Sequence, residues 1–361
     1  MKRFTDNLFG DYYITPAQTT LIEHRTECNP YDENGMLPLF TAPMASVVDD
    51  KNYEEFLDNN IYAIIPRTVS LEKRLELVKK GIWIAMGLQE FENYITNAEI
   101  DYIASIKNTN KQYICVDVAN GHMLSLIRIC KRAKQFFGDK LIIMAGNVAN
   151  AATYCDYAKA GIDYIRIGIG TGSGCATSDK TGIGIELRDV LNSIHSFQQS
   201  IKRELERNDI YKSCPKVVLD GGCKSIRDVI LALALGADYV MCGYLFAKTK
   251  EAAGEIILGR TTTNIETLTE DADNRKLYDA RQISCYKNGR IFYGMSTERA
   301  QSEMGNSTIK PSEGKEFWVP IEYTINEWVI DFIASLRSTM SYCDATDLFH
   351  FHKYVRVFRN W

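Results

Sequence analysis

Short apolar runs recur along the chain, and longer segments with helical periodicity lie between them. Each run is rich in β-branched or other apolar residues and is too short for a helix, which is typical of a parallel strand buried on both faces. The eight runs are Leu37–Thr41, Ile61–Ile65, Ile82–Met86, Tyr113–Val116, Leu141–Met144, Tyr164–Ile167, Val217–Leu219 and Tyr239–Cys242. Helical patterns between them include Leu71–Lys80, Met123–Phe137, Ala149–Ala160 and Ile226–Leu235. Eight successive βα units predict a TIM (β/α)8 barrel.

Glycines and polar residues cluster where the predicted strands end. Asp117 follows the fourth run, Asp220 and Gly221 follow the seventh, and Gly243 follows the eighth. Catalytic groups of barrel enzymes lie at the carboxyl ends of the strands, so we expect the active site there. Glycines at the ends of the last two strands would also let backbone N–H groups approach a phosphate.

The stretch after the sixth run is the most informative segment of the chain. Glycines at positions 168, 170, 172 and 174 alternate with other residues and lead to Cys175. Glycine permits positive φ and close approach to a ligand, so this loop presents the thiol in a polar, accessible setting suited to a nucleophile. A dinucleotide-binding fingerprint fits poorly, because it belongs at the first strand of a βαβ unit and opens directly into a helix. An ordinary glycine loop with an incidental cysteine is the other alternative at this point.

Two regions lie outside the βα repeat. Residues 256–290 are polar and indicate an inserted segment, in which Asn288 and Gly289 predict a two-residue hairpin turn. Residues 297–318 are polar and punctuated by glycine and proline, which predicts a mobile flap. A helical pattern returns after Thr324. We therefore expect one barrel domain over residues 1–361, with the insertion and the C-terminal flap as its additions.

Composition narrows the range of partners. The 361-residue chain has a formal net charge of −4 and no basic stripe, which argues against nucleic acid as a partner. Ten cysteines are scattered without a CxxC pair, so neither a zinc ribbon nor a redox motif is expected. Cys115 and Cys242 lie inside apolar runs and are predicted to be buried thiols. With no signal peptide and no apolar run of membrane-spanning length, we expect a reducing, cytoplasmic setting and no membrane partner.

Several motifs occur along the chain in an order that is known from one enzyme family. They are Asp117-Val-Ala-Asn-Gly121, Gly168-Ile-Gly-Thr-Gly-Ser-Gly-Cys175, Leu219-Asp-Gly-Gly-Cys223, Phe292-Tyr-Gly-Met-Ser296 and Pro311-Ser-Glu-Gly-Lys315. On these motifs the chain resembles the IMP dehydrogenase / GMP reductase family over most of its length, and it looks most like the GMP reductase branch. Dehydrogenases of the family usually carry CBS modules after the second strand, and the stretch between Arg67 and Tyr113 leaves no room for such an insertion. They also carry an Arg-Tyr pair in a long flap, and the short flap here has none.

The chain departs from the family pattern at several positions. Thr171 stands where proline is usual, Ala176-Thr177-Ser178 replaces Thr-Thr-Arg, and Pro66-Arg67 replaces His-Lys. The chain therefore resembles a divergent member of the family.

The resemblance implies NADPH-dependent reductive deamination of GMP to IMP. Cys175 would attack C2 of the purine, expel the 2-amino group as ammonia and form a thioimidate, which a nicotinamide hydride then reduces. Thr177 and Glu313 resemble the pair that handles the proton of the departing ammonia. From the residues alone, Thr177 could instead be a loop-capping hydroxyl and Glu313 a solvated flap carboxylate.

The same resemblance implies binding roles for other positions. Residues expected to contact the purine nucleotide are Ser173, Asp220, Gly221, Gly222, Gly243, Tyr244, Gly294, Met295, Ser296, Lys310, Ser312 and Gly314. Those expected to contact NADPH are Arg67, Asp117, Val118, Ala119, Gly168 and Tyr293. Backbone carbonyls of Gly170, Gly172 and Cys175 would coordinate a monovalent cation such as potassium, and a homotetramer is implied. Asp220 could instead cap a helix, and Arg67 could form a surface salt bridge.

Three other functions stay open at this point. The first is an IMP dehydrogenase that lacks CBS domains, although the short flap has no pair to activate the hydrolytic water. The second is a reductase that acts on a modified purine nucleotide, which the altered loops permit. The third is a catalytically inactive barrel that binds nucleotide as a regulator, and the presence of Cys175, Thr177 and Glu313 together argues against it.

Overall fold

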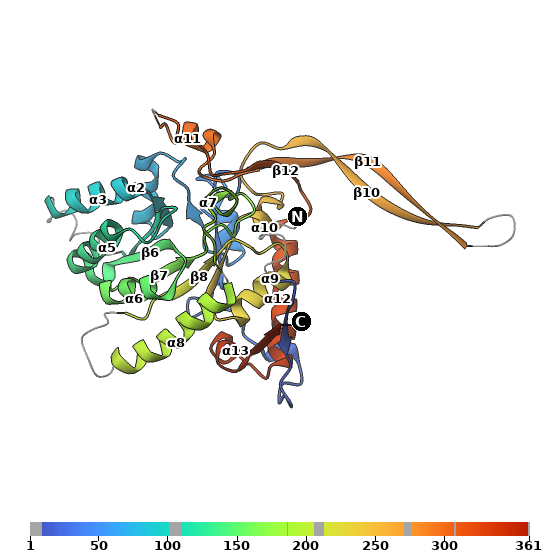
Figure 1. The fold of residues 1–361 in the computed structure, drawn as a ribbon, viewed down its shortest axis with the longest axis horizontal. Helices are drawn as coiled ribbons and strands as arrows, with labels where there is room; N and C mark the ends of the chain where they lie inside the picture. The colour runs from blue at the N-terminus through green and yellow to red at the C-terminus, as the bar shows by residue number, and fades with distance from the viewer. Residues whose placement is uncertain are drawn as a thin grey trace.

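The predicted strands form a parallel eight-stranded barrel (Figure 1). The computed structural model describes residues 9–100, 110–185, 187–205, 213–270, 276–306 and 308–359. The barrel strands are β2 (Leu39–Thr41), β3 (Ile64–Ile65), β4 (Trp83–Met86), β5 (Gln112–Asp117), β6 (Leu141–Val148), β7 (Tyr164–Ile167), β8 (Lys216–Asp220) and β9 (Tyr239–Cys242). Their order is β2-β9-β8-β7-β6-β5-β4-β3, and a parallel bridge between Phe40 and Tyr62 joins the two ends. The predicted TIM barrel is confirmed.

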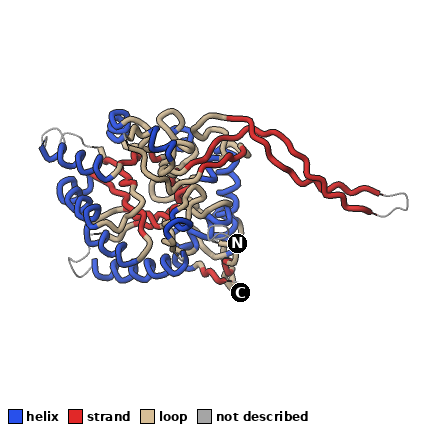
Figure 2. Tube along the Cα trace, turned by 45° about the horizontal axis from the view of Figure 1, so that its top comes forward, coloured by secondary structure: helices blue, strands red, loops and turns tan. Residues whose placement is uncertain are grey.

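Helices surround the strands on the outside of the barrel (Figure 2). They are α1 (Tyr53–Asp58), α2 (Leu71–Lys79), α3 (Leu88–Ile100), α5 (Leu124–Phe137), α6 (Ala151–Ala160), α7 (Thr177–Thr181), α8 (Leu187–Leu205), α9 (Ile226–Ala234), α10 (Tyr244–Ala247), α11 (Glu298–Glu303), α12 (Ile325–Tyr342) and α13 (Leu348–Tyr354), with 3-10 turns at Arg25–Glu27 and Gly138–Lys140. Polar side chains fix several starts: Ser70, Asn150 and Ser225 each accept a bond from the backbone N–H three residues later. Helix α6 begins two residues after the predicted start, because Asn150 is its cap.

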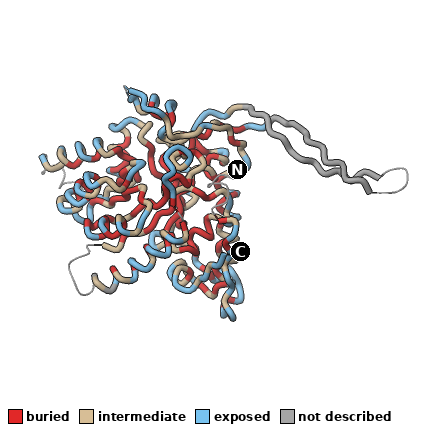
Figure 3. Tube along the Cα trace, viewed as in Figure 1, coloured by how far each residue is buried: buried red, intermediate tan, exposed pale blue. Residues whose placement is uncertain are grey.

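Aromatic side chains fill the amino end of the barrel interior. Phe40 packs edge-on against Trp83, and Tyr239 and Tyr164 lie beside them. The hydroxyls of Tyr62 and Tyr239 both donate to Asp32 Oδ2, at 2.7 and 2.9 Å. Burial is continuous through the strands and the inner faces of the helices (Figure 3). Because this end is packed, a ligand has to enter the barrel from the carboxyl ends of the strands.

The two terminal segments pair with each other outside the barrel. Strand β1 (Tyr12–Thr15) runs antiparallel to β13 (Arg356–Arg359), as the blue and red strands of Figure 1 show. Among the described residues, no helix is both long enough and apolar enough to cross a membrane. The predicted burial of the Cys115 and Cys242 thiols is confirmed.

A long β-ribbon occupies the region predicted as an insertion. Strands β10 (Ile257–Glu270) and β11 (Lys276–Tyr293) pair along their whole length and project away from the barrel (Figure 1). At the base of the ribbon, β12 (Glu316–Pro320) adds a third strand to β11. Helix α11 lies within the segment predicted as a flap, and β12 begins inside that segment and ends two residues beyond it.

The predicted turn at Asn288 and Gly289 is wrong. Both residues lie inside β11, where they pair with Leu258 and Ile257 of β10. The glycine at position 289 allows the Trp318 ring of β12 to pack closely against the β11 backbone. A Cβ atom at this position would lie 2.5 Å from Cε2 of that ring. A glycine in a strand marks a turn, a bulge or a close contact, and the local sequence does not distinguish them.

Candidate active site

The loop after β7 brings Cys175 to the carboxyl end of the barrel. Gly170 has a φ of +74°, a left-handed conformation that favours glycine, and it lies close to Ser178 and Ile183. The Cys175 N–H donates to the Gly172 carbonyl at 3.0 Å, which tightens the turn before the short helix α7. The thiol is half-buried at this point, so it is accessible to a ligand in the barrel mouth.

Three side chains form a continuous chain of hydrogen bonds at the loop. The Cys175 thiol donates to Thr177 Oγ1 at 3.3 Å, and this hydroxyl donates to Glu313 Oε2 at 2.8 Å. The Thr177 backbone N–H also points at the sulfur, at 3.5 Å. A proton can therefore pass between the thiol and the carboxylate through one hydroxyl. The Thr177 N–H can also donate a hydrogen bond to a thiolate at Cys175. Glu313 is thus bonded within the site and is not a freely solvated carboxylate.

Backbone pairing holds the flap against the loop between β7 and α7, which carries Cys175 and is called the cysteine loop below (residues 168–176). Cys175 and Gly314 form an antiparallel bridge, in which the Ala176 N–H donates to the Glu313 carbonyl at 2.6 Å. The Lys315 N–H donates to the Gly174 carbonyl at 2.8 Å, and the Lys315 ammonium pairs with Asp179 Oδ2 at 2.6 Å. The position of the Glu313 carboxylate therefore follows from main-chain contacts with the residues that flank the nucleophile.

Two glycines let these segments approach one another. A Cβ atom on Gly294, after β11, would lie 2.6 Å from the Gly174 carbonyl oxygen. A Cβ atom on Gly314 would lie 2.5 Å from Cγ2 of Thr297. Real Cβ atoms do not come this close, so the cysteine loop, the end of β11 and the flap stack closely only because these positions are glycine.

Gln301 of α11 forms hydrogen bonds with the flap at Lys310, on the amino-terminal side of Glu313. Its buried amide nitrogen donates to the carbonyls of Ser296 and Lys310, at 3.0 and 2.9 Å. Its carbonyl oxygen accepts from the Lys310 N–H at 2.8 Å. The sequence analysis did not identify Gln301, since an isolated glutamine in a polar segment gives no signal for such a contact.

A buried arginine connects two of the predicted binding residues. Arg166 of β7 donates through Nη1 to Asp117 Oδ1 at 2.6 Å and through Nη2 to Asp220 Oδ2 at 2.7 Å. Asn147 adds a bond to Asp220 Oδ2 at 2.8 Å. The sequence analysis missed Arg166 as well, although a charged residue inside an apolar strand run was a usable signal. The helix-cap alternative for Asp220 is wrong, because Ser225 caps α9.

The other predicted nucleotide contacts surround this centre. Gly221 and Gly222 follow β8, and a Cβ on Gly221 would lie 2.7 Å from the Gly172 nitrogen of the cysteine loop. Gly243 and Tyr244 follow β9, where the Tyr244 ring packs against Phe292 and Phe317. The remaining predicted contacts lie in the cysteine loop, after β11 or in the flap: Ser173, Met295, Ser296, Lys310 and Ser312.

The predicted cofactor contacts lie along the next strand ends. Arg67 follows β3, its Nε lies 3.7 Å from Glu90 Oε2, and this buried Nε has no hydrogen-bond partner among the described residues. Arg74 binds the same Glu90 at 2.8 Å. Burial raises the pKa of Glu90, but the bond from Arg74, the Gly87 N–H and the charge of Arg67 outweigh it and lower that pKa. The salt-bridge alternative for Arg67 is therefore supported, since Arg67 pairs with Glu90, although its Nε makes no hydrogen bond with a described residue.

The four other predicted cofactor positions differ in their surroundings. Val118 and Ala119 follow Asp117 at the end of β5. Tyr293, in contrast, is buried, and its hydroxyl donates to Glu303 Oε2 at 2.8 Å. Gly168 lies at the end of β7, and its carbonyl accepts from Asn147 at 2.7 Å.

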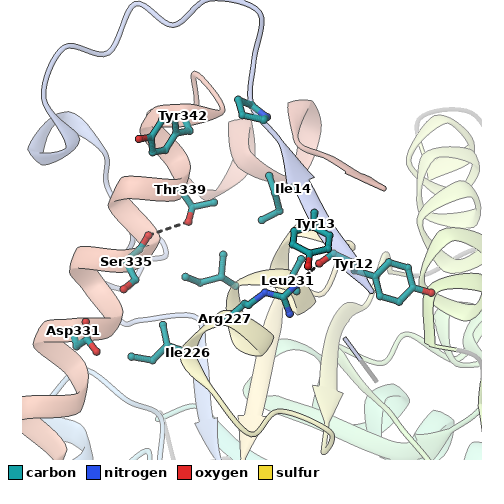
Figure 4. A pocket seen from close by; sticks show the side chains of 12 residues that line it. Tyr12, Tyr13, Ile14, Ile226, Arg227, Leu231, Asp331, Ser335, Thr339 and Tyr342 are labelled. Carbon is teal, nitrogen blue, oxygen red and sulfur yellow. Dashed lines mark hydrogen bonds between the residues drawn. The ribbon is translucent and has the colours of Figure 1, made fainter. Parts of the chain in front are cut away.

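One cavity lies away from this site. A groove of about 500 Å³ opens between β1, α9 and α12, on the outside of the barrel (Figure 4). Tyr13, Leu231 and Tyr342 are among the residues that line it, and none of the predicted site residues does. Chemistry and convergence of polar groups, and not cavity size, therefore identify the site at the barrel mouth.

Side chains in the described part of the chain form no cluster of three His, Cys, Asp or Glu suited to a metal ion. A cation at Gly170, Gly172 and Cys175 would rest on backbone carbonyls alone. The Gly172 carbonyl already accepts the Cys175 N–H, which leaves it one lone pair for a cation.

Comparison with known proteins identifies the family. The sequence profile described as "IMP dehydrogenase / GMP reductase domain" matches residues 8–360. The chain belongs to the IMP dehydrogenase / GMP reductase family. It is 27% identical to the GMP reductase of Buchnera aphidicola subsp. Schizaphis graminum over 94% of this chain and 90% of the relative. It is 30% identical to GMP reductase 2 of Bos taurus over 93% of this chain and 89% of the relative. The GMP reductase of Clostridium acetobutylicum is 26% identical over 94% and 91%.

Proposed function

We propose that this member of the family reduces GMP to IMP and ammonia with NADPH. The observation that carries the proposal is the hydrogen-bonded chain from the Cys175 thiol through Thr177 to Glu313. It supports the proposal because a thiol, a hydroxyl and a carboxylate in one hydrogen-bonded chain are the groups that this reaction needs.

The proposed reaction has two halves. In the first, the Cys175 sulfur bonds to C2 of the purine, the C2–N bond breaks, and the amino group leaves as ammonia. Glu313, acting through the Thr177 hydroxyl, takes the thiol proton and delivers it to the departing nitrogen. In the second, NADPH supplies a hydride to C2, the carbon–sulfur bond breaks, and the Cys175 thiolate is regenerated with IMP as product.

The residues around the relay have proposed binding roles. Asp220 accepts from the ribose hydroxyls, and backbone N–H groups at Gly221, Gly222 and Gly243 bind the phosphate. Arg67, with its unpartnered Nε, and Asp117 face the cofactor. We also propose a potassium ion on the Gly170, Gly172 and Cys175 carbonyls and a homotetrameric assembly. The nine cysteines whose side chains the structure describes are free thiols, which supports a cytoplasmic location.

The flap favours reduction over dehydrogenation. Hydrolysis of the thioimidate needs a group that activates water, and the flap of this chain lacks the Arg-Tyr pair that serves dehydrogenases of the family. Glu313 is instead bonded to Thr177 beside the sulfur, where it suits proton transfer to a departing amine. The relatives named GMP reductase agree with this choice.

A direct assay tests the proposal. Purified protein with GMP and NADPH is compared with the same protein given IMP and NAD, and the nicotinamide absorbance is followed. We expect NADPH oxidation that depends on GMP and releases one ammonia for each NADPH. Efficient conversion of IMP to XMP with NAD would instead identify a dehydrogenase. A reductase that prefers a modified purine would oxidise NADPH with that nucleotide and not with GMP.

A further inference from the structure

Arg166 joins two strands that are not neighbours in the barrel. It lies on β7, and it contacts Asp220 on the adjacent β8 and Asp117 on β5, across the intervening β6. The side chain of Arg166 is 6% exposed, and those of Asp117 and Asp220 are 15% and 19% exposed. One buried cation therefore bridges the ends of β5 and β8, between a predicted cofactor residue and a predicted ribose residue.

The charges of this cluster depend on one another. Burial by itself lowers the pKa of Arg166, but the negative charges of Asp220 and Asp117 outweigh it and raise that pKa, so the guanidinium stays protonated. A buried ion left without its partner is strongly destabilised, so neither carboxylate can leave the arginine at low cost. Arg166 Nε makes no hydrogen bond with a described residue, and the side chain is held by its two terminal nitrogens alone.

Each carboxylate keeps one oxygen for a ligand. Among the described residues, both donors to the Asp220 carboxylate, Arg166 and Asn147, bond to Oδ2, which leaves Oδ1. The bond from Arg166 to Asp117 ends on Oδ1, which leaves Oδ2. A carboxylate has about four lone-pair positions, so a ribose hydroxyl and a cofactor group can bind while the arginine bridge stays intact.

We propose that Arg166 is a positioning residue that fixes the Asp220 and Asp117 carboxylates relative to each other and so couples the nucleotide and cofactor subsites. This proposal rests on the proposed function, since it takes Asp220 as the ribose contact and Asp117 as a cofactor contact. A planar guanidinium suits the role, because its two nitrogens point in fixed directions toward two separate acceptors.

The coupling makes a specific prediction about a residue that the nucleotide does not touch. Asp117→Asn removes one negative charge of the cluster, although its amide oxygen can still accept from Nη1, so the guanidinium is attracted more strongly to Asp220. The guanidinium then occupies lone pairs that a ribose hydroxyl needs. We expect the Kd for IMP to rise by a factor of roughly 3 or more, which is in the range of coupling between residues of one charge network.

Equilibrium binding of IMP and of NADP+, measured by calorimetry, tests the proposal without turnover. We expect Arg166→Met to raise the Kd for both ligands about tenfold or more, since it leaves two neighbouring carboxylates without their cation. Arg166→Lys retains the positive charge but loses the two nitrogens that reach two separate carboxylates. Its Kd values should therefore lie between those of wild type and Arg166→Met. In the Arg166→Met background, Asp117→Asn should no longer change the Kd for IMP. If Arg166→Met does not fold, the same comparison is made in Arg166→Lys, where the effect of Asp117→Asn should shrink.

A matched control comes from the other end of the same strand. Asp163, just before β7, pairs with Lys134 at 3.0 Å, with side chains 23% and 11% exposed. Lys134→Met breaks a partly buried ion pair away from the mouth, so it should lower the melting temperature and leave both Kd values unchanged.

An effect of Asp117→Asn on IMP binding that is equal with and without Arg166 would overturn the coupling. Wild-type protein that binds neither GMP nor IMP would overturn the proposed function as well, whereas normal wild-type binding with unchanged Arg166→Met affinities overturns the role of Arg166 alone.

Discussion

The hydroxyl of Thr177 donates to the carboxylate of Glu313 at 2.8 Å across a separation of 136 positions in the chain. Thr177 follows the nucleophile at the start of α7, and Glu313 belongs to the flap that returns after the ribbon. Their contact forms because the flap pairs with the backbone of Cys175. Proton handling in the proposed reaction therefore depends on how the flap docks, as well as on the identity of the two side chains.

Replacement of Glu313 tests its role in deamination. Glu313→Gln can still accept the Thr177 hydrogen bond but cannot take up a proton. We expect the rate of ammonia release from GMP to fall about 10²–10⁴-fold, the usual contribution of general acid–base catalysis. Nucleotide affinity should change little, and hydride transfer in the reverse half-reaction, from IMP to NADP+ without ammonia, should fall much less. A fall of hydride transfer as large as that of deamination would mean that Glu313 positions the substrate instead.

Thr177 should act as one unit with Glu313. Thr177→Val keeps the shape of the side chain but breaks the relay, so deamination should fall to the level of Glu313→Gln. Thr177→Ser keeps the hydroxyl and should retain most of the activity. The effects of substitutions in residues that act as one relay are not additive. The double variant Thr177→Val/Glu313→Gln should therefore be no slower than either single variant. Independent, multiplying losses in steady-state rates would contradict the relay.

The close approach of the flap at Gly314 is open to a steric test. In Gly314→Ala the new methyl would lie 2.5 Å from Thr297 Cγ2 and 2.9 Å from the Thr297 nitrogen, so the flap has to move. We expect kcat to fall at least about tenfold, because misplacement of catalytic groups by 1 Å can cost 10²-fold. Gly81→Ala is the control: it introduces a left-handed alanine at φ +83°, with nothing within 4 Å, and should cost stability of about 1 kcal/mol without loss of kcat.

Gln301 should determine how firmly the flap is attached. Gln301→Ala removes three hydrogen bonds, two with the backbone of Lys310 in the flap and one with the Ser296 carbonyl, each worth about 1 kcal/mol. We expect faster proteolytic cleavage within residues 297–315 and a lower kcat. Gln198→Ala, which removes a buried glutamine from α8 and its bond to Pro215, should lower global stability without faster cleavage of the flap. Equal cleavage rates in the two variants would show that Gln301 does not hold the flap.

The sequence predicts the barrel well because its signals are local. The bounds of β7 and β9 match the apolar runs, since a strand buried on both faces is a continuous apolar segment. The glycine loop indicates Cys175 for a similar reason, because glycine spacing and a cysteine lie within one short stretch.

The remaining features depend on contacts between distant segments. Arg166 meets its two carboxylates only after the barrel closes, and Gly289 meets Trp318 only after β12 joins the ribbon. In the sequence an arginine in a strand has no visible partner, and an Asn-Gly pair resembles a turn whether or not a ring packs on the glycine.

A covalent nucleotide on Cys175 is the most direct test of the proposed chemistry. The protein is incubated with IMP and NADP+ in the absence of ammonia, quenched with acid, digested and examined by mass spectrometry. We predict that the peptide containing Cys175 carries a purine nucleotide bound through sulfur, formed together with an equal amount of NADPH, and that Cys175→Ala binds IMP but yields neither. NADPH formation with an unmodified Cys175, or turnover near the wild-type rate in Cys175→Ala, would contradict the thioimidate mechanism.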